Sequence, residues 1–390
     1  MNPVIDPAIK EWATANQSML IDAVNEHGSI RAAARALGRA FSGIHEAIGL
    51  AKRKAAARGY SPEHHLTRPV APGYLAKGHS TLYRRGEAEP VLQWVKTSAD
   101  AEAREALQRA AMAALSAELP RVEPIPFTGH ASEHLATVYT LTDCHVGMLA
   151  WHRETGADWD LKIAERTLVG CFAQLIASAP ASAIGVVNQL GDFLHQDGLA
   201  AITPTSGHNL DSDGRFPKIV ETAIRILRRV IGMALAKHER VTVLLAEGNH
   251  DIVSSIWLRA MFKALYENEP RVTVLDSVLP YYVIEHGQTM LAFHHGHLQK
   301  NIALPLLMAA QFPQEWGRTT KRYIHTGHRH HAEEKEHSGV TVIQHPTLAA
   351  RDAYAARGGW HAERFIQSIT YHSKYGQAAR SISTPEMIEA

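Results

Sequence analysis

Five short motifs rich in Asp, Asn and His follow one another in the second half of the chain. They are DCH at 143–145, GD at 191–192, GNHD at 248–251, HHGH at 294–297 and GHRH at 327–330. Each comes directly after a short run of β-branched or aliphatic residues, which predicts that it lies at the end of a strand. Together they offer two carboxylates, an amide oxygen and several imidazoles, enough to hold two divalent ions. Mixed nitrogen and oxygen ligands favour Mn, Fe, Zn or another transition ion over Ca or Mg.

The distribution of histidine supports a metal site. Of the 25 histidines, five precede residue 100 and nine lie between His294 and His345. Imidazole is the commonest metal ligand in proteins. An excess of surface histidines or a disordered metal-binding tract would also give a high count, but here the histidines alternate with strand-like apolar runs. The i, i+2 spacing in DxH and HxH predicts that both side chains lie on one face of an extended strand.

The order DxH, GD, GNHD, histidine before glycine, GHxH resembles the calcineurin-like metallophosphoesterases over about residues 137 to 350. This resemblance implies an α/β fold, a four-layer sandwich of two mixed β-sheets flanked by helices, and a pair of divalent metal ions. Manganese is the expected metal, with iron, zinc or nickel as alternatives. The implied ligands are Asp143, His145 and His330 for the first metal, Asn249, His295 and His328 for the second, and Asp192 as the bridge.

Further residues of the motifs receive expected roles from the same resemblance. Two metal ions about 3.5 to 4 Å apart clamp phosphate oxygens and lower the pKa of a bridging water. His250 resembles the family's proton donor, and we expect Asp251 to fix its tautomer, since a carboxylate partner decides which imidazole nitrogen carries the proton. His297 is expected behind the ligands or facing the substrate. Cys144 and Arg329 alternate with ligands and are expected to point away from the metals.

Residues near the second motif suggest the substrate. The segment GDFLHQDG lacks the Asp-Arg pair of the GDxxDRG protein phosphatases, whereas His195 in GDFLH resembles the GDLFH of DNA-repair nucleases related to SbcD. In those nucleases the histidine faces the substrate phosphate. His208 and Arg215 lie in a polar insert that either contacts a nucleic-acid strand or is a plain loop. Arg153 follows Trp151, a pair that suits a phosphate and a base, unless the tryptophan packs over its own loop.

The first 60 residues predict a small helical domain. Apolar residues at three- and four-residue spacing indicate helices over 18–28, 29–38 and 41–59, with Ser29 and Ser42 as N-caps. The last two helices fit a helix-turn-helix, whose second helix would lie in the major groove. Seven basic residues against one acidic residue lie between positions 31 and 58. The expected DNA contacts are Arg39, Ser42, His45, Lys52, Arg53, Lys54 and Arg58. The alternative is a solvated basic face.

The sequence predicts three regions. Residues 1–60 form the helix-turn-helix domain, residues 61–134 a hairpin and helical linker with a helix over 98–119, and residues 135–390 the catalytic domain. Forty Lys and Arg against 39 Asp and Glu leave no chain-wide field, so a nucleic-acid contact needs a local patch. Two cysteines exclude a disulfide framework and suit a cytoplasmic protein. The chain has no apolar run long enough for a membrane span and no signal peptide.

The sequence therefore predicts a two-metal phosphodiesterase that cuts DNA and is brought to it by the N-terminal domain. The arrangement looks like that of phosphoesterases encoded by phages and prophages. The alternatives are a phosphodiesterase or phosphatase of small nucleotides, and a DNA-binding replication scaffold on an inactivated phosphoesterase fold. A homo-oligomer is compatible with the sequence. SbcD-type nucleases work with an ATPase partner. The resemblance does not imply such a partner for this chain, because its extra domain precedes the catalytic domain.

Overall fold

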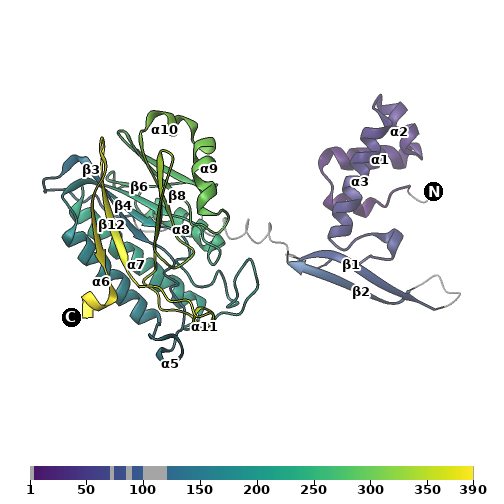
Figure 1. The fold of residues 1–390 in the computed structure, drawn as a ribbon. Helices are drawn as coiled ribbons and strands as arrows, with labels where there is room; N and C mark the ends of the chain where they lie inside the picture. Colours follow the sequence, from purple (N-terminus) through teal and green to yellow (C-terminus); the bar gives the residue numbers. More distant parts are fainter. Residues whose placement is uncertain (1–3, 71–73, 85–89, 100–120, 390) are drawn as a thin grey trace. The chain divides into compact units, whose positions relative to one another are not determined.

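The computed structural model describes residues 4–70, 74–84, 90–99 and 121–389. The chain divides into two compact units, Met1–Arg109 and Ala110–Ala390, each described by itself below (Figure 1). The helix expected over 98–119 lies outside the described residues, apart from its first two positions, which belong to a strand. No helix of the described ranges is long and apolar enough to cross a membrane.

The N-terminal unit begins with a small helical domain. Its elements are η1 (Pro7–Trp12), α1 (Ala15–His27), α2 (Ile30–Leu37) and α3 (Phe41–Ala57). Helices α1 and α2 end at Gly28 and Gly38, both in the left-handed conformation that glycine adopts without strain. Ser29 caps α2 by accepting a hydrogen bond from the Ala32 amide at 3.1 Å, as predicted. The prediction that Ser42 caps the third helix is wrong, because α3 begins at Phe41 and Ser42 is its second residue, within the first helical turn.

A two-stranded antiparallel hairpin completes the described part of this unit. Its strands are β1 (Tyr74–Tyr83) and β2 (Pro90–Ala99), preceded by η2 (Pro62–His64). On one face, the side-chain amide of Gln93 donates to the His64 carbonyl of η2 at 3.2 Å and to Thr81 Oγ1 of β1 at 2.8 Å. The opposite face carries Trp94, paired with Ser80 and exposed.

The C-terminal unit is built on two mixed sheets. The first has the order β13-β12-β3-β4-β5-β6, and the second the order β10-β11-β9-β8-β7. The first consists of β3 (Ser132–Leu141), β4 (Ser182–Gln189), β5 (Arg240–Leu245), β6 (Val272–Val274), β12 (Ile366–His372) and β13 (Gly376–Ser383). The second consists of β7 (Tyr282–His286), β8 (Thr289–Phe293), β9 (Lys321–Thr326), β10 (Glu333–His337) and β11 (Val340–Gln344).

Helices cover the outer face of each sheet. Helices α6 (Leu161–Ser178), α7 (Phe216–Lys237) and α8 (Ile252–Leu265) pack on the six-stranded sheet, and α9 (Leu304–Gln311) and α10 (Pro313–Arg318) on the five-stranded one. The shorter helices are α5 (His152–Thr155), η3 (Asn301–Ala303), α11 (Ala353–Arg357) and α12 (Pro385–Glu389). Between the sheets Val138, Val186 and Leu244 meet Leu291 and Phe293 in a buried apolar layer. The four-layer α/β sandwich is the architecture expected from the sequence.

Strand direction explains where polar residues gather. Strands β3, β4 and β5 are parallel neighbours, and so are β8 and β9 in the other sheet. Side chains that follow the carboxyl ends of parallel strands meet at one edge of a sheet. All five polar motifs follow these five strands, so both sheets contribute to one group of residues.

Candidate metal centre

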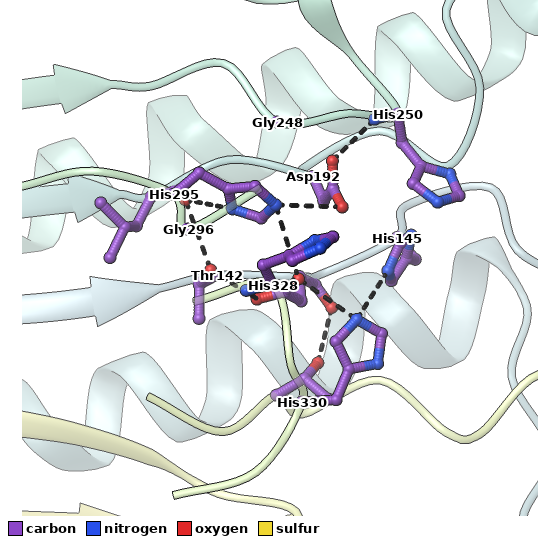
Figure 2. Close-up of polar contacts among 12 residues, drawn as sticks. Thr142, His145, Asp192, Gly248, His250, His295, Gly296, His328 and His330 are labelled. Atoms are coloured by element: carbon purple, nitrogen blue, oxygen red, sulfur yellow. Dashed lines mark hydrogen bonds and ion pairs between the residues drawn. The ribbon is translucent and has the colours of Figure 1, made fainter. Parts of the chain in front are cut away.

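The expected ligands form two compact groups. The ligating atoms of Asp143, His145 and His330 all lie within 4.8 Å of one another, and so do those of Asp192, His295 and His328. In the first group His330 Nε2 lies 3.2 Å from Asp143 Oδ1 and 3.3 Å from His145 Nε2. In the second His295 Nε2 lies 3.2 Å from Asp192 Oδ2 (Figure 2). The same His295 nitrogen lies 3.9 Å from Asp143, so the groups adjoin.

Unsatisfied polar atoms show that these residues fit metal ions. Asn249 Oδ1, the remaining expected ligand atom, is buried without a hydrogen-bond partner among the described residues. Leaving such an atom unpaired costs about 1–3 kcal/mol, which coordination of a cation would recover. Two carboxylates this deeply buried also require positive charge nearby. Two divalent ions would satisfy both demands.

Hydrogen bonds behind the ligands orient them. Thr142 Oγ1 donates to Asp143 Oδ2 at 2.6 Å, and the backbone amide of His328 donates to the same oxygen at 2.9 Å. His295 Nδ1 lies 2.7 Å from the Leu190 carbonyl and must donate to it, since a carbonyl only accepts. In the neutral imidazole this bond places the single proton on Nδ1, so Nε2 is the nitrogen that would bind a metal.

The charges of the site act strongly on each other. Burial alone would raise the pKa of Asp143, but the neighbouring His330 and His295 imidazoles outweigh it and hold that pKa below its usual range. Burial lowers the pKa of His295, and the carboxylates of Asp192 and Asp143 more than reverse this, raising it to about 10. The pocket between these groups therefore attracts positive charge, which is the electrostatic requirement of a cation site.

The backbone at the ligands departs from the prediction. The i, i+2 pairs do not lie on extended strands, because both motifs begin after their strand has ended. Instead Asp143, His145, Asp192, His328 and His330 all have positive φ, between 42° and 71°. Left-handed backbone is costly for residues other than glycine. Asp143 and His145 reach the same ligand group, whereas His328 and His330 reach different groups.

Two motif glycines are required by close approach. A Cβ at Gly248 would lie 2.0 Å from Asp192 Oδ1, and one at Gly191 would lie 2.5 Å from His295 Nδ1. Both distances are shorter than any real contact of a Cβ atom. The glycines thus let the loops after β4 and β5 reach the ligands of the second group.

His250 is held differently from the prediction. Its Nδ1 lies 2.8 Å from the His195 carbonyl and donates to it, which leaves Nε2 free. Asp251 does not fix this tautomer, so that expectation is wrong. Its carboxylate is buried, where burial and then the charge of Asp192 raise its pKa to about 7. It accepts instead from the backbone amides of Asp192, Phe193, Leu194 and Gly248. Asp251 therefore joins the loops after β4 and β5.

His195 lies against two other imidazoles. Its Nδ1 is 3.3 Å from His145 Nδ1, and its ring stacks on that of His250 with centroids 5.6 Å apart. The ligating atoms of the three rings lie within 4.8 Å of one another. The His195 side chain is buried, and its Nε2 has no hydrogen-bond partner in the described part of the chain. Sequence reasoning missed this three-histidine cluster, because the residues come from three separate motifs.

A cavity of about 750 Å³ opens at the metal centre. Its lining includes His145, Asp192, Asn249, His250, His328 and His330, and on another side residues between Thr347 and Arg364. Arg329 is also part of the lining, and it is exposed to solvent. Cys144 is buried in the apolar core, as expected.

The four residues proposed to bind substrate lie outside the lining of this cavity. His297 stacks on His294 beside the second ligand group, with Nδ1 unpaired among the described residues. Arg153 covers the ring of Trp151 at 5.0 Å, and His208 and Arg215 are exposed on the insert before α7. None of His297, Arg153, His208 and Arg215 is in the lining of the 750 Å³ cavity.

The proposed DNA contacts all lie on or directly beside α3. Its buried face consists of Ile44, Ile48, Ala51 and Ala55. The exposed residues of the proposed set are Arg39, Ser42, His45, Arg53 and Lys54. Lys52 is partly covered and pairs with Glu63 at 3.1 Å, and Arg58 at the end of the helix is also partly covered.

No protein-family model matches the chain, and no curated protein does. Solved structures similar to it include a predicted phosphoesterase from Streptococcus pneumoniae, with 11% identity, a TM-score of 0.30 and coverage of 65% of this chain and 92% of that one. A dimetal phosphatase from Danio rerio has 10% identity, a TM-score of 0.36 and coverage of 64% and 98%. Zinc-bound Vps29 from Entamoeba histolytica has 13% identity, a TM-score of 0.28 and coverage of 64% of this chain and 99% of that one. At such TM-scores these likenesses do not assign a function.

Proposed function

We propose that the chain is a two-metal phosphodiesterase of the calcineurin-like metallophosphoesterase superfamily, with DNA as its substrate. The observation that carries this proposal is the pair of adjoining Asp-His groups, which meet where His295 Nε2 lies between Asp192 and Asp143, at 3.2 and 3.9 Å. Asp143, His145 and His330 would hold one ion, and Asn249, His295 and His328 the other, with Asp192 between them. Mixed nitrogen and oxygen donors suit manganese, iron, zinc or nickel.

The residues around the ions have separable tasks. When bound, the ion pair would supply a hydroxide near neutral pH and clamp the phosphate oxygens. His250 lines the cavity with Nδ1–H bound to the His195 carbonyl, so the imidazolium form would present Nε2–H and give that proton to the leaving oxygen. Asp251 fixes the loops that carry Asp192 and His250. His195 lies directly behind His145 and His250, and a contact to the phosphate would require the His195 ring to reach past them.

The N-terminal unit supports DNA as the substrate. Helices α2 and α3 are joined by a short turn and pack through a shared apolar core, which fits a helix-turn-helix. Exposed Arg39, Arg53 and Lys54 would contact phosphates, and Ser42 and His45 lie at the start of α3. Tethering such a domain to a phosphodiesterase raises the effective concentration of DNA at the metal centre.

A second function has an observation of its own in favour. The cavity at the metal centre is of the size that encloses a small ligand. In a phosphodiesterase of small nucleotides, the substrate would fill this cavity. The helical domain would then serve regulation or assembly.

Hydrolysis assays on the full chain test the proposal. The Mn²⁺-loaded protein should cut labelled linear, circular or single-stranded DNA, and it should lose activity with a chelator and as Asp192→Asn or His250→Gln. Hydrolysis of bis(p-nitrophenyl) phosphate with all DNA forms intact would favour small nucleotides. No hydrolysis, with fewer than one ion bound per folded chain, would reject the enzyme and favour a scaffold. Asp276→Asn, an exposed carboxylate on the same unit, is the matched control and should stay active.

A further inference from the structure

One wall of the cavity at the metal centre is a compact loop, residues 347–364, that contains α11. Two arginines form hydrogen bonds near the two ends of this loop. Arg364 donates to the Leu348 carbonyl through Nε at 2.8 Å and Nη2 at 2.6 Å. Arg351 donates through Nε and Nη2 to the Thr155 carbonyl and approaches His361 Nε2 at 3.0 Å with Nη1. These bonds join the two ends of the loop to each other and tie the loop to Thr155 of α5.

The loop presents two large aromatic side chains at the cavity. Trp360 and Tyr354 both line it, in an edge-to-face contact with centroids 5.2 Å apart. Trp360 is 56% exposed and Tyr354 72%, although burial of such rings is favourable. The Trp360 ring lies over Gly358, where a Cβ would come within 3.1 Å of it. Close packing on a bare backbone therefore positions the indole.

Another part of the lining has the complementary chemistry. It includes five of the seven expected metal ligands and the exposed residue Arg329. Metal ions and an arginine attract phosphate oxygens, whereas an exposed indole and phenol attract a flat aromatic ring. A ligand that matches both parts of the lining carries a phosphate and an aromatic ring. Nucleotides have this composition.

We propose that Trp360, supported by Tyr354, is the stacking platform for an unpaired nucleobase whose phosphodiester lies at the metal centre. This inference rests on the proposed function and narrows its substrate. A base inside a duplex has both faces covered by its neighbours, so it reaches such a platform only after leaving the stack. The base belongs either to a single strand or frayed end, or to a small nucleotide.

Fluorescence of 2-aminopurine tests the platform without turnover. We would titrate the full chain, in chelator, with a single strand carrying 2-aminopurine, the same strand in a duplex, and the 2-aminopurine deoxynucleoside monophosphate. Stacking on indole quenches the probe. Removing a base-stacking aromatic residue costs about 5- to 150-fold in affinity, so Trp360→Ala should weaken binding by that factor. Trp360→Phe should retain most of it, and Tyr354→Ala should give a smaller loss.

Tyr375 provides the matched control. It is a similarly exposed aromatic residue of the same unit, at 66%, and it does not line the cavity. Tyr375→Ala should leave quenching unchanged, and all variants should keep the wild-type melting temperature.

The outcomes separate the platform from the proposed function. Equal affinity of Trp360→Ala and wild type, or equal quenching of duplex and single strand, overturns the platform. Binding of the single strand identifies nucleic acid as the source of the base, and binding of the monophosphate alone identifies a small nucleotide. If the Mn²⁺-loaded protein hydrolyses no diester yet shows the Trp360-dependent quenching, the proposed function fails while the platform stands.

Discussion

The hydrogen bond from Thr142 to Asp143 should control the affinity of the first metal. Thr142 is buried, and its hydroxyl donates to Asp143 Oδ2 at 2.6 Å. Thr142→Val keeps the shape of the side chain and removes the hydroxyl, including its longer contact of 3.4 Å to the Leu190 carbonyl, and leaves Asp143 Oδ2 with the amide of His328 at 2.9 Å. Hydrogen bonds to charged groups contribute about 1.5–3 kcal/mol, and mutation of groups that orient metal ligands costs about 10–100-fold in affinity.

Calorimetric titration of chelator-stripped protein with Mn²⁺ at neutral pH measures this effect. One of the two sites should weaken by about 10–100-fold, while the other keeps its affinity. Thr347→Val is the matched control, because Thr347 is a buried threonine that donates to the backbone carbonyl of Asp143, not to its carboxylate. It should lose stability without losing a site selectively. Unchanged affinity at both sites of Thr142→Val, or equal weakening of both, would refute the reasoning.

Three further predictions concern other parts of the chain. His238 is buried against Tyr139, and burial lowers its pKa to about 4. The pKa in the unfolded chain is about 6.5, so at a pH between these two values the unfolded chain binds a proton that the folded chain does not. The free energy of unfolding therefore decreases as the pH drops through this range. In urea titrations, His238→Asn should lose about 3 kcal/mol less than the wild type over the same range. Gly248→Ala should abolish Mn²⁺ binding and destabilise the fold by about 1–3 kcal/mol, since its Cβ would overlap Asp192. Arg53→Glu with Lys54→Glu should weaken DNA binding and lower its salt dependence, measured by fluorescence anisotropy.

Each of these has an outcome that contradicts it. Identical pH dependence of unfolding in His238→Asn and wild type would show that this imidazole does not titrate as its burial requires. Normal Mn²⁺ binding by Gly248→Ala would mean that the loop after β5 can move away from Asp192. The double charge reversal should hydrolyse bis(p-nitrophenyl) phosphate at the wild-type rate, and unaltered DNA affinity would remove α3 as the contact.

Sequence periodicity was sufficient for the framework of the C-terminal unit. Apolar residues recur at three- and four-residue spacing over the whole length of helices α6 and α7, so local spacing is enough to indicate both helices. The short apolar runs became β3, β4, β5, β8 and β9, so the motifs after them had to meet. The proximity of the expected ligands therefore followed from the order of strands and motifs.

Other parts depend on tertiary contacts that no local pattern contains. Asp251 follows His250 directly, yet its carboxylate turns to amides of the loop after β4, some 58 residues away in sequence. Asp and His adopt left-handed backbone more often than most residues, but no local pattern fixes it at Asp143 and four other expected ligands, where the surrounding loops impose it. The loop of residues 347–364 carries no motif, and only its place beside the ligands gives Trp360 a role.

At the expected ligands with left-handed backbone, the stability of the fold and the binding of metal ions make opposite demands on the sequence. Residues other than glycine held in that conformation cost about 1–3 kcal/mol each when the strain is unrelieved. Replacing Asp143 or Asp192 by glycine would relieve strain and remove buried charge while destroying the metal centre. Directed evolution of this chain for heat resistance alone should therefore enrich variants that have lost the candidate metal site, so such a selection has to retain a screen for Mn²⁺ binding in every round.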